Sequence, residues 1–80
     1  MMKNYTVKEL AHLLDDYYIG VTFSEGVRAW EAPEMFETKE ALVSKYGKRN
    51  IRWISLGGSE DDIYQLIEVE GARKWTIKHF

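Results

Sequence analysis

Residues Gly57–Asp62 have the sequence GGSEDD, in which two glycines stand beside three acids. A glycine-rich phosphate loop needs backbone N–H groups and a lysine facing the anion at the start of a helix. Here the acids would repel an anion, and a strand is expected to follow. A calcium loop needs acids at alternate positions and a distant bidentate glutamate, which three consecutive acids do not supply. We therefore expect a hairpin turn, in which the glycines admit the backbone angles and the acids keep the tip in water.

His12, Asp15 and Asp16 have the spacing of metal ligands on one helix face, because the two acids follow the histidine by three and four residues. The second histidine, His79, lies far along the chain, on the expected last strand. We interpret the three residues as a solvated polar face with weak contacts between neighbouring turns. The sequence therefore predicts no metal site and no cofactor.

Nucleophilic catalysis lacks its usual combination of residues in this chain. There is no cysteine, and no serine stands with a histidine in a recognisable motif. We therefore predict that the protein is not an enzyme, and we rank a small enzyme last among the functions considered.

Lys45, Lys48, Arg49 and Arg52 form the one basic cluster of the sequence. They could contact nucleic-acid phosphates, with Trp30 stacking on a base, or they could stabilise the negative end of a helix. The chain has a net charge of −2, so it lacks the broad basic surface that is typical of a nucleic-acid-binding domain. We prefer the helix interpretation and keep nucleic-acid contact as the alternative.

The length and composition describe a small soluble domain. The chain of 80 residues predicts one domain spanning residues 1–80. The lack of cysteine fits a reducing cytoplasm, and the polar N-terminus lacks the apolar run of a signal peptide. No apolar stretch approaches the roughly 18 residues of a membrane span. We expect a cytoplasmic protein without membrane association.

Two helices are predicted from their caps and their apolar periodicity. Thr6 and Glu9 form a capping box for a helix from about Val7 to Asp15. Thr38 can cap a second helix from about Lys39 to Tyr46. The expected buried faces contain Val7, Leu10, Ala11 and Leu14 in the first helix, and Leu42, Val43 and Tyr46 in the second.

Five strands are predicted from alternating apolar residues and turn signals. They cover residues 17–23, 27–32, 51–56, 63–70 and 74–80. The single proline, Pro33, marks a strand end or a bulge. The expected fold is α+β, in the order α-β-β-α-β-β-β, with an antiparallel sheet and two helices packed on it.

The third and fourth strands can be aligned by asking which residues would lie opposite one another. A register that places Trp53 across from Ile67 also places Arg52 across from Glu68, so that apolar residues meet and opposite charges meet. The last hairpin aligns in the same way. One sheet face then holds the expected core residues Ile51, Trp53, Ile63, Ile67, Val69, Trp75 and Ile77.

The opposite face of the aligned strands gathers a second apolar group near one end. Its members are Ile54, Leu56, Tyr64, Leu66 and Phe80. A sheet face in contact with water rarely collects so many apolar residues. Either another element of the chain covers them, or they bind a different protein, or they mediate self-association. A second copy could also pair with the C-terminal strand to form a homodimer.

We predict a non-enzymatic protein-binding module that uses this second group, ringed by charge as interface hot spots are. Its small size suggests an accessory or inhibitory protein of a phage or mobile element. The alternative is a nucleic-acid-binding protein that uses the basic cluster after the second helix. The sequence leaves open the partner, the source organism, the oligomeric state and whether the second face is covered within the monomer.

Overall fold

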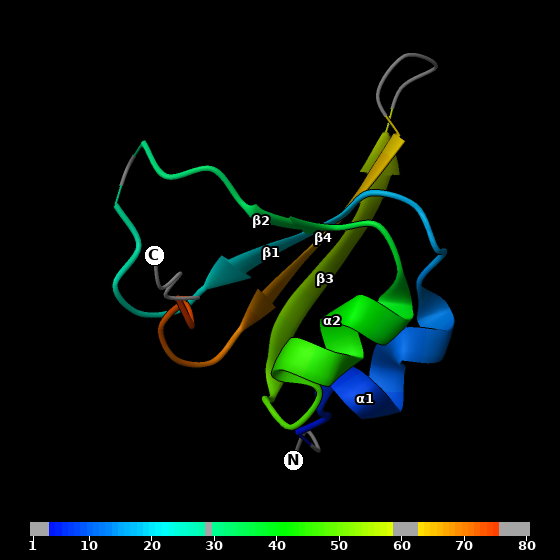
Figure 1. Cartoon of the computed structure of the whole chain (residues 1–80), viewed down its shortest axis with the longest axis horizontal. Coiled ribbons are helices and arrows are strands. Elements are labelled where there is room, and N and C mark those ends of the chain that lie inside the picture. The colour runs from blue at the N-terminus through cyan, green and yellow to red at the C-terminus, as the bar shows by residue number, and fades with distance from the viewer. Residues whose placement is uncertain (1–3, 29, 59–62, 76–80) are drawn as a thin grey trace, which may run out of the picture.

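The computed structural model describes residues 4–28, 30–58 and 63–75. In chain order its elements are α1 (Val7–Leu10), the 3-10 turn η1 (Ala11–Leu13), β1 (Ile19–Phe23), β2 (Glu34–Phe36), α2 (Lys39–Tyr46), β3 (Ile51–Gly58) and β4 (Ile63–Val69). The predicted α+β class is confirmed, because both helices lie on one side of a four-stranded sheet (Figure 1). Neither described helix is long and apolar enough to cross a membrane.

The strands lie side by side in the order β2-β1-β4-β3. The two outer pairs, β1 with β2 and β3 with β4, are antiparallel, whereas the central pair of β1 and β4 is parallel. The prediction of a wholly antiparallel sheet is therefore wrong. Parallel neighbours need a crossover connection, and here β2, α2 and β3 together make it.

The first helix begins where the sequence predicts and ends earlier. The Thr6 hydroxyl accepts a hydrogen bond from the Glu9 backbone N–H at 3.2 Å, and the Glu9 carboxylate accepts one from the Thr6 N–H at 3.0 Å. Past η1, the amide of buried Gln65 donates to the carbonyl oxygens of Asp15 and Tyr17 at 3.0 and 2.9 Å. It also accepts from the Asp15 N–H at 2.7 Å. These bonds hold the chain in a turn, so the helix does not reach Asp15.

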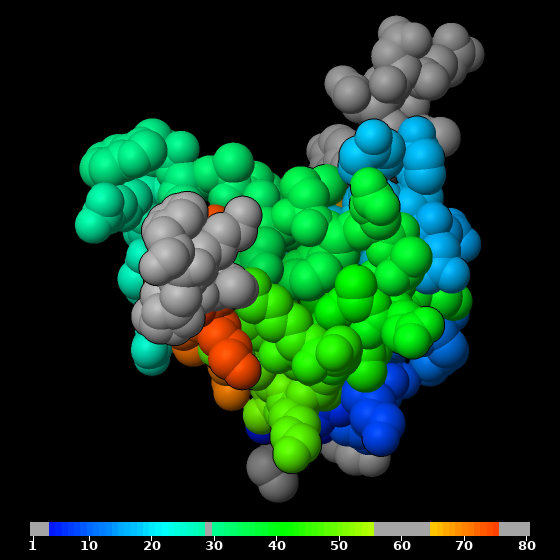
Figure 2. All heavy atoms as spheres, in the orientation of Figure 1, coloured from blue at the N-terminus to red at the C-terminus, as the bar shows by residue number. Residues whose placement is uncertain are grey.

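The second helix has the predicted bounds. Thr38 caps it, since its hydroxyl accepts from the Ala41 N–H at 3.1 Å. Leu42 and Tyr46 face the sheet and are fully buried. In the space-filling view of Figure 2, α2 occupies the middle of the molecule, and the connection between β1 and β2 projects at one side.

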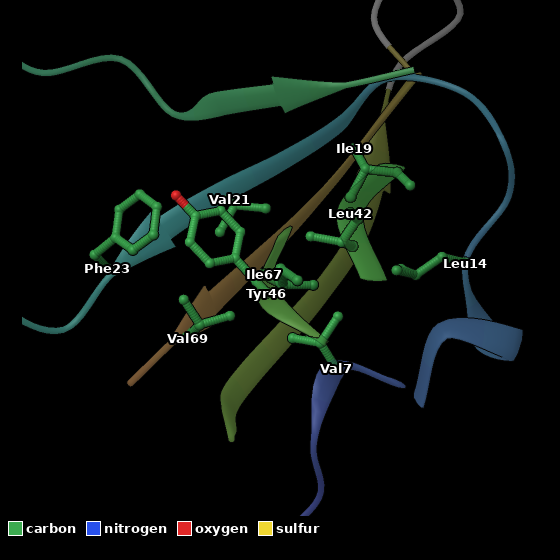
Figure 3. Close-up of a cluster of buried hydrophobic side chains, with 9 residues drawn as sticks. All are labelled: Val7, Leu14, Ile19, Val21, Phe23, Leu42, Tyr46, Ile67 and Val69. Atoms are coloured by element: carbon green, nitrogen blue, oxygen red, sulfur yellow. The ribbon is translucent and has the colours of Figure 1, made fainter. Parts of the chain in front are cut away.

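The core lies between the two helices and the face of the sheet that they cover, as Figure 3 shows. Val7, Leu14, Leu42 and Tyr46 contribute from the helical side, and the sheet contributes Ile19, Val21, Phe23, Ile67 and Val69. Phe36, Val43, Ile51 and Ile54 pack against this cluster while remaining partly exposed.

Two predicted strands differ from the structure. The second strand lies at Glu34–Phe36, directly after Pro33, and not at residues 27–32. The predicted last strand is wrong at Lys74 and Trp75, which have no strand structure, because the Lys74 N–H donates to the hydroxyl of Tyr46 in α2 at 3.2 Å. Residues 76–80, the rest of that predicted strand, lie outside the described residues.

Candidate functional site

The register between β3 and β4 changes by one residue near the start of β3. Ile51 lies across from Val69, as predicted, but Trp53 lies across from Glu68 and not from Ile67. A bulge between Ile51 and Trp53 accommodates the extra residue. Because neighbouring residues of a strand point to opposite faces, a shift of one residue exchanges the two faces of β3 relative to the prediction. Trp53 is accordingly 41% exposed and not part of the core.

The shift divides the predicted partner-binding group. Ile54 lies across from Ile67 and packs against the core, whereas Leu66 lies across from Ser55, one residue further along β3. Ile54 and Leu66 therefore lie on opposite faces of the sheet, and the single surface that the predicted register formed is absent from the described structure.

For Leu56 and Tyr64, the structure describes the pairing of the backbone. Leu56 pairs with Gln65, and Tyr64 pairs with Gly57. Phe80 lies outside the described residues. Partner binding by these residues stays a prediction, and it now needs a different geometric basis.

Two members of the basic cluster lie at the end of α2 and already have partners. The Lys45 ammonium group lies 2.7 Å from the Glu34 carboxylate. The Arg49 guanidinium group donates to the backbone carbonyl oxygens of Glu70 and Ala72 and stacks on the Tyr46 ring, 4.9 Å from its centroid. These contacts direct both positive charges into the molecule.

The other two members, Lys48 and Arg52, differ in their contacts. Arg52 projects from the bulge and its Nε lies 3.2 Å from the carboxylate of Glu68, the residue that the sequence paired with it. Lys48 is exposed and forms no ion pair with the residues that the structure describes. Since three of the four cations are engaged within the chain, nucleic-acid contact by the cluster stays a prediction without structural support.

Glu34 is the centre of a buried charged group that the sequence did not indicate. Its carboxylate accepts hydrogen bonds from Lys45 at 2.7 Å and from the Tyr46 hydroxyl at 2.6 Å. Arg73 Nε lies 3.2 Å away as a charge contact without hydrogen-bond geometry. Burial acts to raise the pKa of Glu34, but the hydrogen bonds from Lys45 and Tyr46 and the charges of Lys45 and Arg73 lower it below its usual value.

Tyr46 responds in the opposite direction. Burial and the hydrogen bond that it donates to Glu34 raise the pKa of Tyr46 to about 12. Both groups therefore keep one protonation state through the neutral range. The arrangement stabilises the junction of β2, α2 and the chain after β4.

Two of the three residues considered as metal ligands, His12 and Asp16, contact other groups of the chain. The His12 Nδ1 atom lies 3.0 Å from the carbonyl oxygen of Glu9. The Asp16 carboxylate accepts a hydrogen bond from the N–H of Lys39, the first residue of α2, at 2.8 Å. Within the described ranges, no three His, Asp or Glu side chains are grouped so that they could hold a metal ion.

Two tryptophans project strongly from the end of the molecule near the β1–β2 connection. Trp30 is 79% and Trp75 is 66% exposed. The guanidinium groups of Arg28 and Arg73 lie 5.8 and 4.3 Å from the respective ring centroids. These contacts restrict the rings, and they leave most of each aromatic surface in water.

The two outer strands of the sheet have different edges. β2 has three residues, follows a proline and begins with the ion-paired Glu34, and short length, proline and charge are features that protect an edge from further pairing. β3 has eight residues and contains no charged residue from Trp53 to Gly58. Among the described strands, β3 is therefore the longer outer strand, and it carries no charge after Arg52.

Hydrogen bonds at the start of β3 show which way its backbone faces. The Glu70 N–H donates to the Asn50 carbonyl oxygen at 3.0 Å, so Glu70 faces β3. Backbone groups alternate along a strand, so Glu68 also faces β3. Its partner Trp53 therefore directs its own N–H and C=O toward β4.

The same alternation identifies the free groups. Ser55, two residues after Trp53, also faces β4, so Ile54 and Leu56 direct their backbone N–H and C=O groups away from the sheet. Nearer the start of the strand, the outward Ile51 N–H already donates to the Tyr5 carbonyl oxygen at 2.7 Å. Within the part of the chain that the structure describes, the edge beyond Ile51 is open.

An open cleft lies at this edge. It has a volume of about 670 Å³, and its lining includes Tyr5, Leu10, Ile51, Arg52, Trp53 and Ile54. Trp53 and Ile54 belong to opposite faces, so the cleft extends around the edge of β3 and not over one face alone. Tyr5 and Trp53, which are 42% and 41% exposed, contribute aromatic surface to it.

The structure thus brings together outward backbone groups, a strand segment without charge from Trp53 to Gly58, and a cleft whose lining includes Tyr5 and Trp53. Comparisons of the chain with models of protein families, with curated proteins and with solved structures found no match.

Proposed function

We propose that the protein is a non-enzymatic protein-binding module that binds an extended segment by adding it as a strand to β3. The observation that carries this proposal is the outward backbone of Ile54 and Leu56 on a strand without charge from Trp53 to Gly58. Strand addition uses main-chain hydrogen bonds for affinity and side-chain pockets for specificity. The edge of β3 supplies the hydrogen-bonding groups, and the cleft beside it supplies the pocket.

The contrast between the two edges supports this assignment. An exposed uncharged edge strand is an aggregation hazard that proteins usually protect. The β2 edge has three such protections, as described above, whereas the bulge, Arg52 and the contact with Tyr5 protect β3 only near its beginning. An edge left open beside an aromatic cleft is the arrangement expected where pairing is the function.

The cleft can select the partner's side chains. A strand laid along β3 presents alternate residues to the two faces. Residues on one side would meet Trp53, and those on the other would meet Ile54 and the surface near Tyr5 and Leu10. Large aromatic residues carry much of the binding energy of protein interfaces, so Trp53 is the expected hot spot.

A random peptide library displayed on phage, selected against the folded protein, tests the proposal. Selected peptides should contain alternating apolar residues, and Trp53→Ala should raise their Kd by about tenfold or more, as hot-spot truncation does. Trp30→Ala is the matched control, since it removes a more exposed tryptophan far from β3. If Trp30→Ala weakens binding and Trp53→Ala does not, the binding site is elsewhere.

Leu56→Pro examines the backbone contribution. Proline removes the outward N–H of an edge strand while the ladder toward β4 remains intact. Peptide binding should fall while the circular dichroism spectrum is retained. Such a module could act as an accessory or inhibitory protein by occupying the partner's own strand, in keeping with the role that the small size suggested for a phage or mobile element.

A further inference from the structure

We propose that the segment bound at β3 is β3 of a second copy of this chain, in an antiparallel pair centred on Ser55. This inference rests on the proposed function, because it names the occupant of the same edge. The two four-stranded sheets would join into one continuous sheet across a two-fold axis. Such an axis requires that the paired segment be complementary to itself.

The length of the open edge defines the centre of the pair. Tyr5 and Thr6 already cover the edge at Ile51 and Asn50, through the hydrogen bond to Tyr5 and the bridge between Thr6 and Asn50. The open part of β3 therefore runs over residues 52–58, and its midpoint is residue 55. Pairing with Ser55 opposite Ser55 uses the whole open part and leaves Tyr5 and Thr6 in place.

The direction of the backbone groups agrees with this register. Ile54 and Leu56 are the residues that face outward, so an antiparallel ladder must pair them with outward-facing residues of the second copy. With Ser55 at the axis, Ile54 of each copy lies across from Leu56 of the other. Sliding one copy by one residue along the other would place outward-facing residues opposite residues that face their own β4. Only a slide of two residues, which moves the centre of the pair to Ile54 or Leu56, preserves the ladder.

The nearest such registers are worse on geometric grounds. Centring the pair on Ile54 would bring the second copy's Gly58 across from Asn50, where Thr6 already lies. Centring it on Leu56 would shorten the overlap to residues 54–58. The Ser55 register therefore has the longest pairing without displacing the N-terminal segment.

The residues brought together in this register are compatible in type. Ile54 meets Leu56, which pairs two aliphatic residues. Trp53 meets Gly57, and an aromatic side chain across from a glycine is a recurrent device for stabilising edge glycines. Residues 53–57 contain no charge, so no like charges oppose one another along this stretch. The segment is thus self-complementary about Ser55.

A charge-swap experiment at Ser55 tests the axis directly. Ser55 is exposed, and at the axis it opposes itself. Ser55→Lys alone and Ser55→Glu alone would each place like charges together and should raise the dimer dissociation constant at least about tenfold. An equimolar mixture of the two variants should form the mixed dimer. Sedimentation equilibrium measures these states as one or two times 9.4 kDa.

Each outcome decides the matter. A wild type that stays monomeric at about 100 μM, so that the Kd of any dimer lies above that concentration, overturns the inference. So does a dimer that persists in both single variants, or a mixture that stays monomeric. If the wild type is monomeric but selected peptides still bind in a manner that depends on Trp53, the proposed function stands and only its occupant changes. If neither the peptides nor a second copy binds β3, both proposals fail.

A cysteine variant provides a second readout that does not depend on charge. The chain has no cysteine of its own. In the proposed register Ser55 and its symmetry mate form a non-hydrogen-bonded pair, whose Cα atoms lie about 4.5 Å apart, within the range of a disulfide. Ser55→Cys should form a covalent dimer on mild oxidation, and Ser44→Cys, exposed on α2, should remain monomeric. Equal cross-linking of both variants contradicts the register.

Discussion

The hydrogen bond between Tyr46 and Glu34 gives a prediction whose size can be worked from the structure. Tyr46→Phe removes only the hydroxyl, which donates to the Glu34 carboxylate at 2.6 Å and accepts from the Lys74 N–H at 3.2 Å. The ring remains, with its edge-to-face contacts to Phe23 and Phe36. The substitution therefore tests the polar contact without creating a large cavity.

The expected cost follows from what each partner loses. A hydrogen bond to a charged group contributes about 1.5–3 kcal/mol. Glu34 keeps Lys45 and Arg73, so its charge stays paired, and exposed Lys74 can donate to water instead. We therefore expect the free energy of unfolding to fall by about 1.5–3 kcal/mol. For a domain of this size, this corresponds to a Tm decrease of roughly 6–24 °C.

Urea unfolding followed by tryptophan fluorescence and circular dichroism measures this change. Tyr17→Phe is the matched control, because Tyr17 is exposed and its hydroxyl forms no hydrogen bond with the described residues. It should change the free energy of unfolding by no more than about 0.5 kcal/mol. A loss below about 0.5 kcal/mol for Tyr46→Phe, or an equal loss for both variants, would refute the role assigned to the buried hydroxyl.

Three further predictions concern the stability of the domain. The folded state holds the pKa of Glu34 below its ordinary value of 4.5, so its stabilising contribution should be present above that pH and lost as the pH falls below it; Glu34→Gln should flatten the dependence of the unfolding free energy on pH there. Gln65→Leu should destabilise the domain by about 2–3 kcal/mol in urea titrations, since it leaves the backbone of Asp15 and Tyr17 without its partners. Gly71→Ala should lower the free energy of unfolding by about 1 kcal/mol or more, because Gly71 has φ = 92°, and no loss would contradict that backbone angle.

Local signals in the sequence are sufficient to predict where the two helices begin. The capping box of Thr6 and the cap of Thr38 involve residues three positions apart, and both are present. The early end of the first helix was not predictable in this way. It depends on Gln65, which is distant in sequence and is identified only by the tertiary fold.

The register between β3 and β4 could not be predicted by matching the types of opposite residues, because this method does not detect a β-bulge. The alignment assumed an uninterrupted ladder, and the bulge between Ile51 and Trp53 broke that assumption. The second strand is predicted before Pro33, whereas β2 begins after it with the buried Glu34. Its burial becomes understandable only once Lys45 and Tyr46 are seen around it.

The candidate site rests on a different property of the same residues. The sequence predicts Ile54 and Leu56 as members of an apolar sheet face, whereas the proposed strand addition uses their outward backbone groups. Which strand forms the edge depends on the parallel pairing of β1 with β4, and a test of consecutive hairpins does not examine such long-range pairs.

That parallel pairing also constrains how the chain reaches its folded state. β3 and β4 are neighbours in sequence and can form a hairpin early, but β1 meets β4 only by closing a loop from Ile19 to Gln65. Contacts between such distant residues form slowly, because the entropy of loop closure must be overcome first. Until β1 arrives, the hairpin has two open edges. The nascent protein is therefore most vulnerable to mispairing during this interval, when the edge of β4 that later pairs with β1 is exposed together with the outer edge of β3.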